Sequence, residues 1–92
     1  MFFRGKPGAI DFIFTQVVVD TVSIEEANEL LERHKNGDWG DIDSVDRQIN
    51  EQSIAKGVRN VFSRYRTRRG GIVEIVSGYG RITMRLSHEW VF

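Results

Sequence analysis

The sequence predicts a single α+β domain, spanning residues 1–92, in which an antiparallel sheet of about four strands carries one or two helices on one face. Three observations support this class. Residues 10–20 and 58–87 are rich in β-branched and aromatic side chains, as strands are. Residues 23–37 show helical spacing between a start and a stop signal. A chain of 92 residues has room for one hydrophobic core.

The first predicted element is a strand between Ile10 and Asp20. This segment contains no Gly or Pro, and the turn signal Pro7-Gly8 precedes it. Its apolar character indicates burial on at least one face.

A helix is predicted from Ile24 to Lys35. Ser23 and Glu26 have the spacing of a capping box, in which the Ser23 hydroxyl accepts from the Glu26 amide and the Glu26 side chain reaches back to the Ser23 amide. Asn36-Gly37 is a typical left-handed stop. One face of this helix collects the apolar positions and a histidine, namely Ile24, Ala27, Leu30, Leu31 and His34.

A tight loop carrying Trp39 precedes a second, weaker helix. Asp43 or Ser44 caps this helix, and Gly57 ends it. Val45 and Ile49 share one of its faces.

Three further strands are predicted at Val58–Arg68, Ile72–Ser77 and Arg81–Ser87. A two-residue turn at Gly78-Tyr79 and a three-residue loop at Arg69-Gly70-Gly71 join them. These connections predict the cross-strand pairs Val73 with Met84, Ile75 with Ile82, Thr67 with Val73, and Tyr65 with Ile75. A slip by one residue would push arginines into the core.

Alternation along these strands separates two faces of the sheet. We expect the helix to cover the apolar face through Leu30 and Leu31. The residues of that covered face are Val61, Tyr65, Val73, Ile75, Ile82, Met84 and Leu86. The opposite face should carry Arg64, Arg66, Arg81 and Arg85, with Glu74 among them.

Charge is sorted along the chain although the total is zero. Residues 20–55 hold ten acidic and three basic residues, a net charge of −7, and residues 56–92 hold eight basic and two acidic residues, a net charge of +6. Such a distribution predicts two electrostatic faces that steer partners.

Several classes of site and location are disfavoured by composition. The absence of cysteine excludes disulfides and thiolate metal sites. The first residues lack the apolar stretch of a signal peptide, and the apolar run at residues 10–19 is too short to span a bilayer. We therefore expect a cytoplasmic protein with no membrane partner.

Just over a third of the chain, from Arg33 to Tyr65, resembles a family of small proteins from plasmids and other mobile elements, some of which bear the name of a type I restriction-modification subunit. The shared pattern resembles R-H-x-x-G-D-W-G, then D-x-x-x-N-E-x-S, then G-x-R followed by Ser and Tyr. The matching residues are Arg33, His34, Gly37, Asp38, Trp39, Gly40, Asp46, Asn50, Glu51, Ser53, Gly57, Arg59, Ser63 and Tyr65. The typical ending of the family is acidic, so Arg81 and Arg85 are departures from it. The resemblance implies, by analogy, a role in conflict between a mobile element and its host.

The segment from Gly37 to Asp41 has two interpretations. It could be a binding loop with an exposed Trp39 as anchor. Alternatively it is a structural corner, in which the glycines make the turn and Trp39 caps the core.

Two groups of residues are candidates for a metal site or a catalytic site: the aspartates between residues 38 and 46, and the two histidines, His34 and His88. Asp38, Asp41, Asp43 and Asp46 could collect a hard cation, but the calcium-loop pattern fails, which favours helix caps and solvated acids. A nucleophilic triad would need Ser or Cys beside a histidine, and no nucleophile-elbow motif is present. We therefore predict no enzyme, no metal and no cofactor.

Two charged surfaces remain as candidates for partner binding. The basic surface consists of Arg64, Arg66, Arg68, Arg69, Arg81 and Arg85, and the acidic surface of Glu25, Glu29, Glu32, Asp38 and Asp41. Arginine suits both protein hot spots and phosphate, and an acidic surface can imitate nucleic acid.

The preferred hypothesis is a non-enzymatic mobile-element protein, of phage or plasmid, that binds and inhibits a host defence nucleoprotein complex, as an anti-CRISPR or anti-restriction protein does. The alternative is a small nucleic-acid-binding accessory protein that uses the basic sheet face. Large apolar residues at both termini, Met1-Phe2-Phe3 and Trp90-Val91-Phe92, add the hypothesis of a homodimer.

Overall fold

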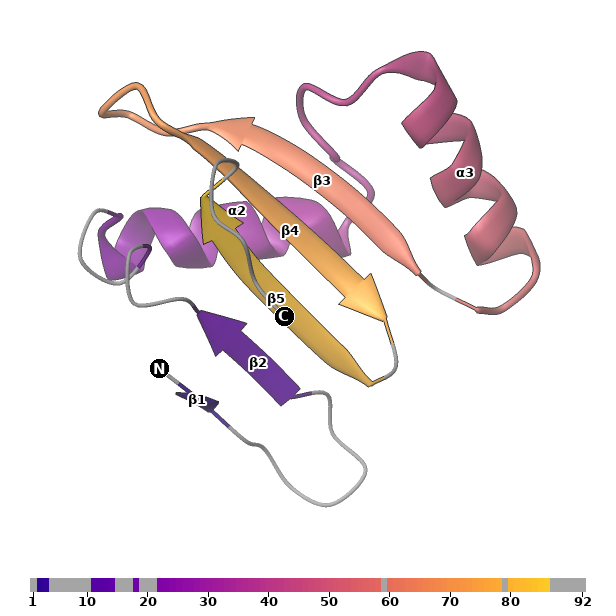
Figure 1. Ribbon diagram of the computed structural model, residues 1–92, viewed down its shortest axis with the longest axis horizontal. Helices are drawn as coiled ribbons and strands as arrows, with labels where there is room; N and C mark the ends of the chain where they lie inside the picture. The colour runs from indigo at the N-terminus through magenta and orange to yellow at the C-terminus, as the bar shows by residue number, and fades with distance from the viewer. Residues whose placement is uncertain are drawn as a thin grey trace.

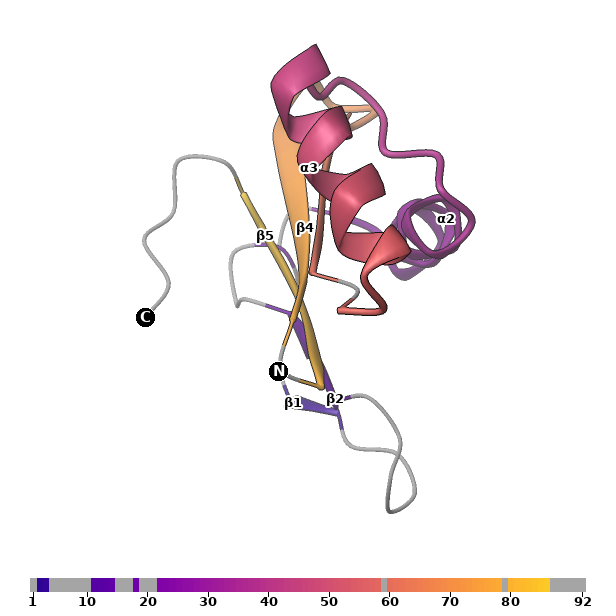
Figure 2. The same ribbon diagram turned by 90° about the vertical axis from the view of Figure 1, so that its right-hand side faces the viewer.

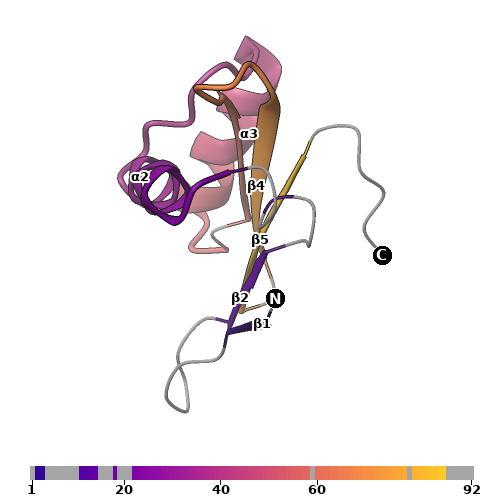
Figure 3. The ribbon, with the colours of Figure 1, turned by 90° about the vertical axis from the view of Figure 1, so that its left-hand side faces the viewer.

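The computed structural model describes residues 2–3, 11–14, 18, 22–58, 60–78 and 80–86. Five strands form one sheet in the order β1-β2-β5-β4-β3 (Figure 1). They are β1 (Phe2–Phe3), β2 (Asp11–Phe14), β3 (Val61–Arg66), β4 (Ile72–Gly78) and β5 (Arg81–Leu86). Helices α2 (Ile24–Lys35) and α3 (Ser44–Ala55) lie on the same side of this sheet (Figures 2 and 3). The predicted α+β class is confirmed.

The sheet combines antiparallel and parallel pairs. Strands β3, β4 and β5 form the expected antiparallel meander. Strand β2 lies parallel to β5, with Phe12 opposite Ile82. A parallel pair needs a long crossover, and the chain between β2 and β5 supplies it, because both helices and the β3–β4 hairpin are in that interval. The two-residue β1 pairs antiparallel with β2 at the far edge.

The predicted strand registers are wrong by two residues. Ile75 lies opposite Met84 rather than Ile82, and Tyr65 lies opposite Val73 rather than Ile75. In the β4–β5 hairpin Gly78 lies opposite Arg81, so Gly78 belongs to the strand pair and not to the predicted turn. The β3–β4 connection takes residues 67–71, closed by the Thr67 amide donating to the Gly71 carbonyl at 2.9 Å. A slip of two residues keeps every side chain on its face, which is why burial could not detect the error.

The core forms between the sheet and α2. Its buried residues are Val18, Val22, Ala27, Leu30, Tyr65, Val73, Ile75, Ile82, Met84 and Leu86, with Leu31 packed against them. The covered face is therefore the predicted one, except that Val61 is only half-buried. Figure 1 shows α2 passing behind the strands that supply most of these side chains.

Helix α2 has the predicted ends, and Ser23 Oγ accepts from the Glu26 amide at 3.1 Å. The other half of the capping box is wrong, because Glu26 is buried and its Oε2 accepts from the Arg68 amide at 2.8 Å. Ile24 is also wrongly placed on the apolar face, since its side chain is 77% exposed. On an ideal helix Ile24 lies about 90° from the mean direction of Ala27, Leu30 and His34, which accounts for its exposure.

Helix α3 begins after Asp43, whose Oδ1 accepts from the Asp46 amide at 2.8 Å. Its apolar side chains Val45 and Ile49 are exposed. The buried residue of this helix is Asn50. Helix α3 therefore packs beside β3 through a polar side chain rather than an apolar stripe (Figure 1).

Candidate functional site

The outer face of the sheet, opposite the helices, carries a row of three charged side chains. The strand registers place Arg64, Glu74 and Arg85 side by side on β3, β4 and β5. Arg64 Nη2 lies 2.8 Å from Glu74 Oε2, and Arg85 Nε lies 3.3 Å from Glu74 Oε1. The Glu74 side chain is only 8% exposed. One nearly buried carboxylate therefore holds two guanidinium groups.

A largely apolar row, made of an aromatic, an aliphatic and a threonine side chain, lies next to this charged row. Phe62, Val76 and Thr83 are opposite one another on the three strands, and all are half-buried. The Arg64 guanidinium lies over the Phe62 ring, with Cζ 5.5 Å from its centroid. The outer face thus alternates charged and apolar rows instead of presenting a continuous basic track.

Two outer-face arginines are exposed at opposite ends of the strands. Arg66 lies opposite Ile72, and Arg81 lies opposite Gly78. Neither forms an ion pair with another side chain in the described part of the chain. These are the cations that the outer face leaves available to a partner.

The predicted basic surface is therefore divided. Arg68 belongs to the β3–β4 loop, where its Nη2 lies 2.7 Å from Glu29 Oε2 of α2. Arg69 is exposed in the same loop. The loop ties the hairpin to the helix layer, so Arg68 and Arg69 are not part of the outer-face array of Arg64, Arg66, Arg81 and Arg85.

The predicted acidic surface lies on the helix side. Glu25, Glu29 and Glu32 are exposed on α2. Asp38 pairs with Arg33, with Oδ2 2.7 Å from Nε, and this hydrogen bond lowers the pKa of Asp38. Asp41 is exposed in the loop before α3. The acidic and basic segments of the sequence therefore lie on opposite sides of the sheet.

The loop containing Trp39 lies along the free edge of β3. The Arg64 amide donates to the Trp39 carbonyl at 3.1 Å, and the Asp41 amide donates to the Arg64 carbonyl at 2.7 Å. Gly40 has φ +70°, and a Cβ there would lie 2.2 Å from the Arg64 carbonyl oxygen. Trp39 is 7% exposed. The structural corner is therefore the correct interpretation, and an exposed tryptophan anchor is wrong.

Helix α3 covers the next part of the same edge. Asn50 Nδ2 donates to the Phe62 carbonyl at 2.8 Å, and Asn50 Oδ1 accepts from the Phe62 amide at 2.9 Å. Ser53 Oγ accepts from the Asn60 amide at 2.7 Å. The Asn50 side chain thus pairs with β3 as a neighbouring strand would, and the edge becomes closed to other chains.

The residues of the resemblance pattern hold this arrangement together. Gly37 and Gly57 have φ of 83° and 74° after the two helices, and the Asp46 amide completes the cap on α3. Glu51 is exposed on α3, and Arg59 lies outside the described residues. Most of the pattern therefore has a structural explanation.

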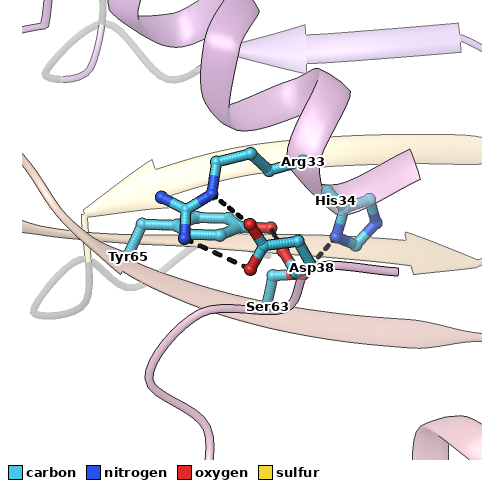
Figure 4. Close-up of polar contacts among 5 residues, drawn as sticks. All are labelled: Arg33, His34, Asp38, Ser63 and Tyr65. Carbon is cyan, nitrogen blue, oxygen red and sulfur yellow. Dashed lines mark hydrogen bonds and ion pairs between the residues drawn. The ribbon is translucent and has the colours of Figure 1, made fainter. Parts of the chain in front are cut away.

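Tyr65 connects the loop to the core beneath it (Figure 4). Its hydroxyl donates to the Asp38 carbonyl at 2.6 Å, and the Arg33 guanidinium covers its ring, with Cζ 4.7 Å from the centroid. Burial raises the pKa of Tyr65. Arg33, Asp38 and Tyr65 together fix the exit of the chain from α2.

His34 contacts two serines, which sequence reasoning did not foresee. Its Nδ1 lies 2.5 Å from Ser63 Oγ (Figure 4), and its Nε2 lies 2.5 Å from Ser77 Oγ. Burial lowers the pKa of His34 to about 4. Both ring nitrogens are occupied by hydroxyls, which leaves neither for an orienting carboxylate, and Ser63 has no exposed surface. This arrangement anchors α2 on the sheet. His88, the other candidate, lies outside the described residues.

In the described ranges, no group of three or more His, Asp or Glu side chains is placed to hold a metal ion. Of the aspartates considered for a cation, Asp43 caps α3 and Asp38 binds Arg33. None of the described helices has the length and apolar character to cross a membrane.

A scan against protein-family models, a search of curated proteins and a search of solved structures each find no match for this chain. The resemblance seen between Arg33 and Tyr65 therefore stays a prediction.

Proposed function

We propose that this chain is a non-enzymatic binding domain that contacts a protein partner through the outer face of the sheet. The observation that carries the proposal is the composition of this face. A largely apolar row of Phe62, Val76 and Thr83, with threonine its one polar member, lies between the exposed cations Arg66 and Arg81. Arginine combined with aromatic and aliphatic side chains is typical of protein interfaces.

The charge of this face indicates the chemistry of the partner. On β3, β4 and β5 the outer face carries four arginines, Arg64, Arg66, Arg81 and Arg85, against Glu74, which is a net charge of +3 for these three strands. The complementary surface is therefore acidic, with apolar side chains to meet the Phe62 row.

A protein is favoured over nucleic acid because the unpaired cations are not continuous across the face. Glu74 neutralises part of the charge at the centre, and an apolar row interrupts the rest. A phosphate backbone is a regular array of charges that requires unpaired cations along its length. The outer face offers such cations at its two ends.

A narrower form of the proposal is inhibition of a host defence nucleoprotein complex. Its support is the resemblance to mobile-element proteins together with the separated charges. In this form the outer face binds an acidic surface of the complex, and expression of the protein restores phage plating on a strain that carries the targeted system.

The proposal can be tested with two tagged baits of equal charge. The first is Arg66→Glu/Arg81→Glu, which reverses the exposed outer-face cations. The second is Arg47→Glu/Lys56→Glu, which makes the same change in charge at exposed positions of α3 and just after it. The tagged proteins are used to capture partners from nuclease-treated lysate. We expect the wild-type protein and the α3 variant to capture the same protein partner, and the outer-face variant to lose it. The purified partner should then bind in a binary assay with the same ranking.

Two results would overturn this proposal. If the outer-face and α3 variants bind the partner equally well, the outer face does not make the contact. If the wild-type protein binds labelled DNA or RNA at physiological salt, and the outer-face variant does not, the ligand is nucleic acid.

A further inference from the structure

We infer that Glu74 determines the class of ligand that the outer face accepts, by withholding Arg64 and Arg85 from polyanions. This inference rests on the proposed function, because it concerns the same face. It assigns to one buried carboxylate the distinction between a protein ligand and nucleic acid.

The geometry shows how the carboxylate engages both neighbours. Arg64 donates to Glu74 Oε2 from Nε at 3.3 Å and from Nη2 at 2.8 Å, and Arg85 donates to Oε1 from Nε at 3.3 Å. Each oxygen of Glu74 therefore serves a different strand. The Arg64 and Arg85 side chains remain 41% and 29% exposed, so they reach the surface although Glu74 balances one of their two positive charges.

A guanidinium in this position is otherwise suited to phosphate. Arginine presents planar, forked donors that match a phosphate group. Here part of that fork is already directed at a carboxylate in the same row. A phosphate that approaches meets the negative charge of Glu74 directly beneath the arginines and must compete with it for the same donors. A protein surface, with a lower density of charge, meets a smaller penalty.

Replacement of Glu74 by an uncharged residue should therefore allow the outer face to bind nucleic acid. Without the carboxylate, Arg64 and Arg85 join Arg66 and Arg81 as four unpaired cations on neighbouring strands. Each additional phosphate contact releases bound counterions, so affinity for nucleic acid should rise and become more sensitive to salt.

The test compares Glu74→Gln with Glu51→Gln by fluorescence anisotropy. Glu51 is exposed on α3, so its replacement makes the same change in net charge away from the face. The probes are a labelled single strand and a duplex of about 20 nucleotides, at about 50 mM and about 200 mM salt. We expect Glu74→Gln to bind at least about tenfold more tightly than Glu51→Gln, with a slope of log K against log salt steeper by about one to two.

A second variant covers the case in which Glu74→Gln does not fold, which circular dichroism would show. Glu74→Thr removes the same carboxylate with a β-branched residue that suits a strand. It should gain affinity for the same probes over Glu51→Gln. If neither folded Glu74 variant binds more tightly than Glu51→Gln, the inference is wrong.

The two proposals can fail separately. If neither the wild-type protein nor Glu74→Gln binds the probes, Glu74 does not select the ligand, but the protein partner remains in place. If the wild-type protein binds them at physiological salt and Glu74→Gln binds far more tightly, Glu74 acts as inferred and the proposed protein ligand is wrong.

Discussion

His34 illustrates how one residue joins two layers of this fold. It lies near the end of α2, and its two ring nitrogens contact hydroxyls on β3 and β4. Serine hydroxyls can donate to or accept from a neutral imidazole, so both contacts are satisfied without a charge. Since burial holds the pKa of His34 at about 4, the ring is neutral in the folded protein at neutral pH.

This burial makes stability depend on pH. The pKa of His34 is about 4 in the folded protein against a usual value of 6.5, so between these values the unfolded chain binds more protons. The contribution of His34 is complete above pH 6.5 and falls as the pH drops towards 4, by roughly 3 kcal/mol in total. We expect urea denaturation to show this loss in the free energy of unfolding.

A His34→Gln variant should flatten the dependence in that interval, because glutamine keeps hydrogen-bonding groups and does not titrate. His88→Gln reports the contribution of the other histidine. An equal loss of stability in wild type and His34→Gln between pH 6.5 and 4 would show that other groups are responsible.

Gly40 and Gly37 form a matched pair for a second prediction. Both have positive φ, but a Cβ at Gly37 meets nothing within 4 Å, whereas at Gly40 it meets the Arg64 carbonyl at 2.2 Å and the Tyr65 ring at 2.6 Å. Gly37→Ala should cost about 1 kcal/mol of stability from backbone strain. Gly40→Ala should cost about 3 kcal/mol or more, because the loop must move off the β3 edge. Thermal unfolding of both variants measures the difference, and equal losses would contradict this account.

The outer edge of β3 is covered by a loop and a helix instead of a neighbouring strand. Edge strands expose unpaired amides and carbonyls that invite aggregation. Here the loop at residues 39–41 and the side chains of α3 take the place of a neighbouring strand. This explains why α3 faces β3 with an asparagine and leaves Val45 and Ile49 exposed.

Asn50→Ala tests this role. The change removes the Asn50 partners of the Phe62 backbone and leaves its partly buried amide and carbonyl short of hydrogen bonds, so we expect a loss of about 1–2 kcal/mol in the free energy of unfolding and a greater tendency to aggregate. Gln48→Ala, at an exposed position of the same helix, should change stability by less than about 0.5 kcal/mol. Chemical denaturation and light scattering measure both effects, and a loss in Asn50→Ala no larger than in Gln48→Ala would exclude this role.

Local signals predicted elements well and pairings poorly. The ends of α2 follow from Ser23 and Gly37, which act on their own neighbours in sequence. The predicted registers of β3, β4 and β5 were wrong by two residues. Alternation reveals a slip by one residue, because the side chains then change face, but a slip by two residues leaves every side chain on the same face. The edge contacts of Asn50 and the contacts of His34 were not predictable, since their partners lie 12 to 43 residues away and no local pattern announces them.

The same limit applied to the candidate site. Alternation correctly placed Arg64, Arg66, Arg81 and Arg85 on one face with Glu74. It could not show that Glu74 bridges Arg64 and Arg85, because this depends on the register that brings the three into one row. Because Glu74 pairs with Arg64 and Arg85, only Arg66 and Arg81 of the four arginines predicted for this face remain unpaired among the described residues.

For the whole molecule, the acidic and basic surfaces lie too far apart to stabilise the fold by attracting each other. The molecule measures 36 × 34 × 24 Å. Its helices, which carry the acidic surface, lie on one side of the sheet (Figure 2), and the basic outer face is the other side. The Debye length is about 10 Å at 0.1 M salt, so such surfaces attract each other weakly across the domain. Stability must then come from the apolar side chains between α2 and the sheet.

Salt should therefore change binding much more than folding. The ion pairs that connect layers or loops, Arg68 with Glu29 and Arg33 with Asp38, join exposed side chains, and solvent screening leaves such pairs little effect on stability. We expect the free energy of unfolding in urea to change by less than about 1 kcal/mol between about 50 mM and about 500 mM NaCl. Glu29→Gln should shift it by a similarly small amount. A loss of several kcal/mol with salt would mean that the two charged faces hold the fold together, and would leave them unavailable to steer a partner.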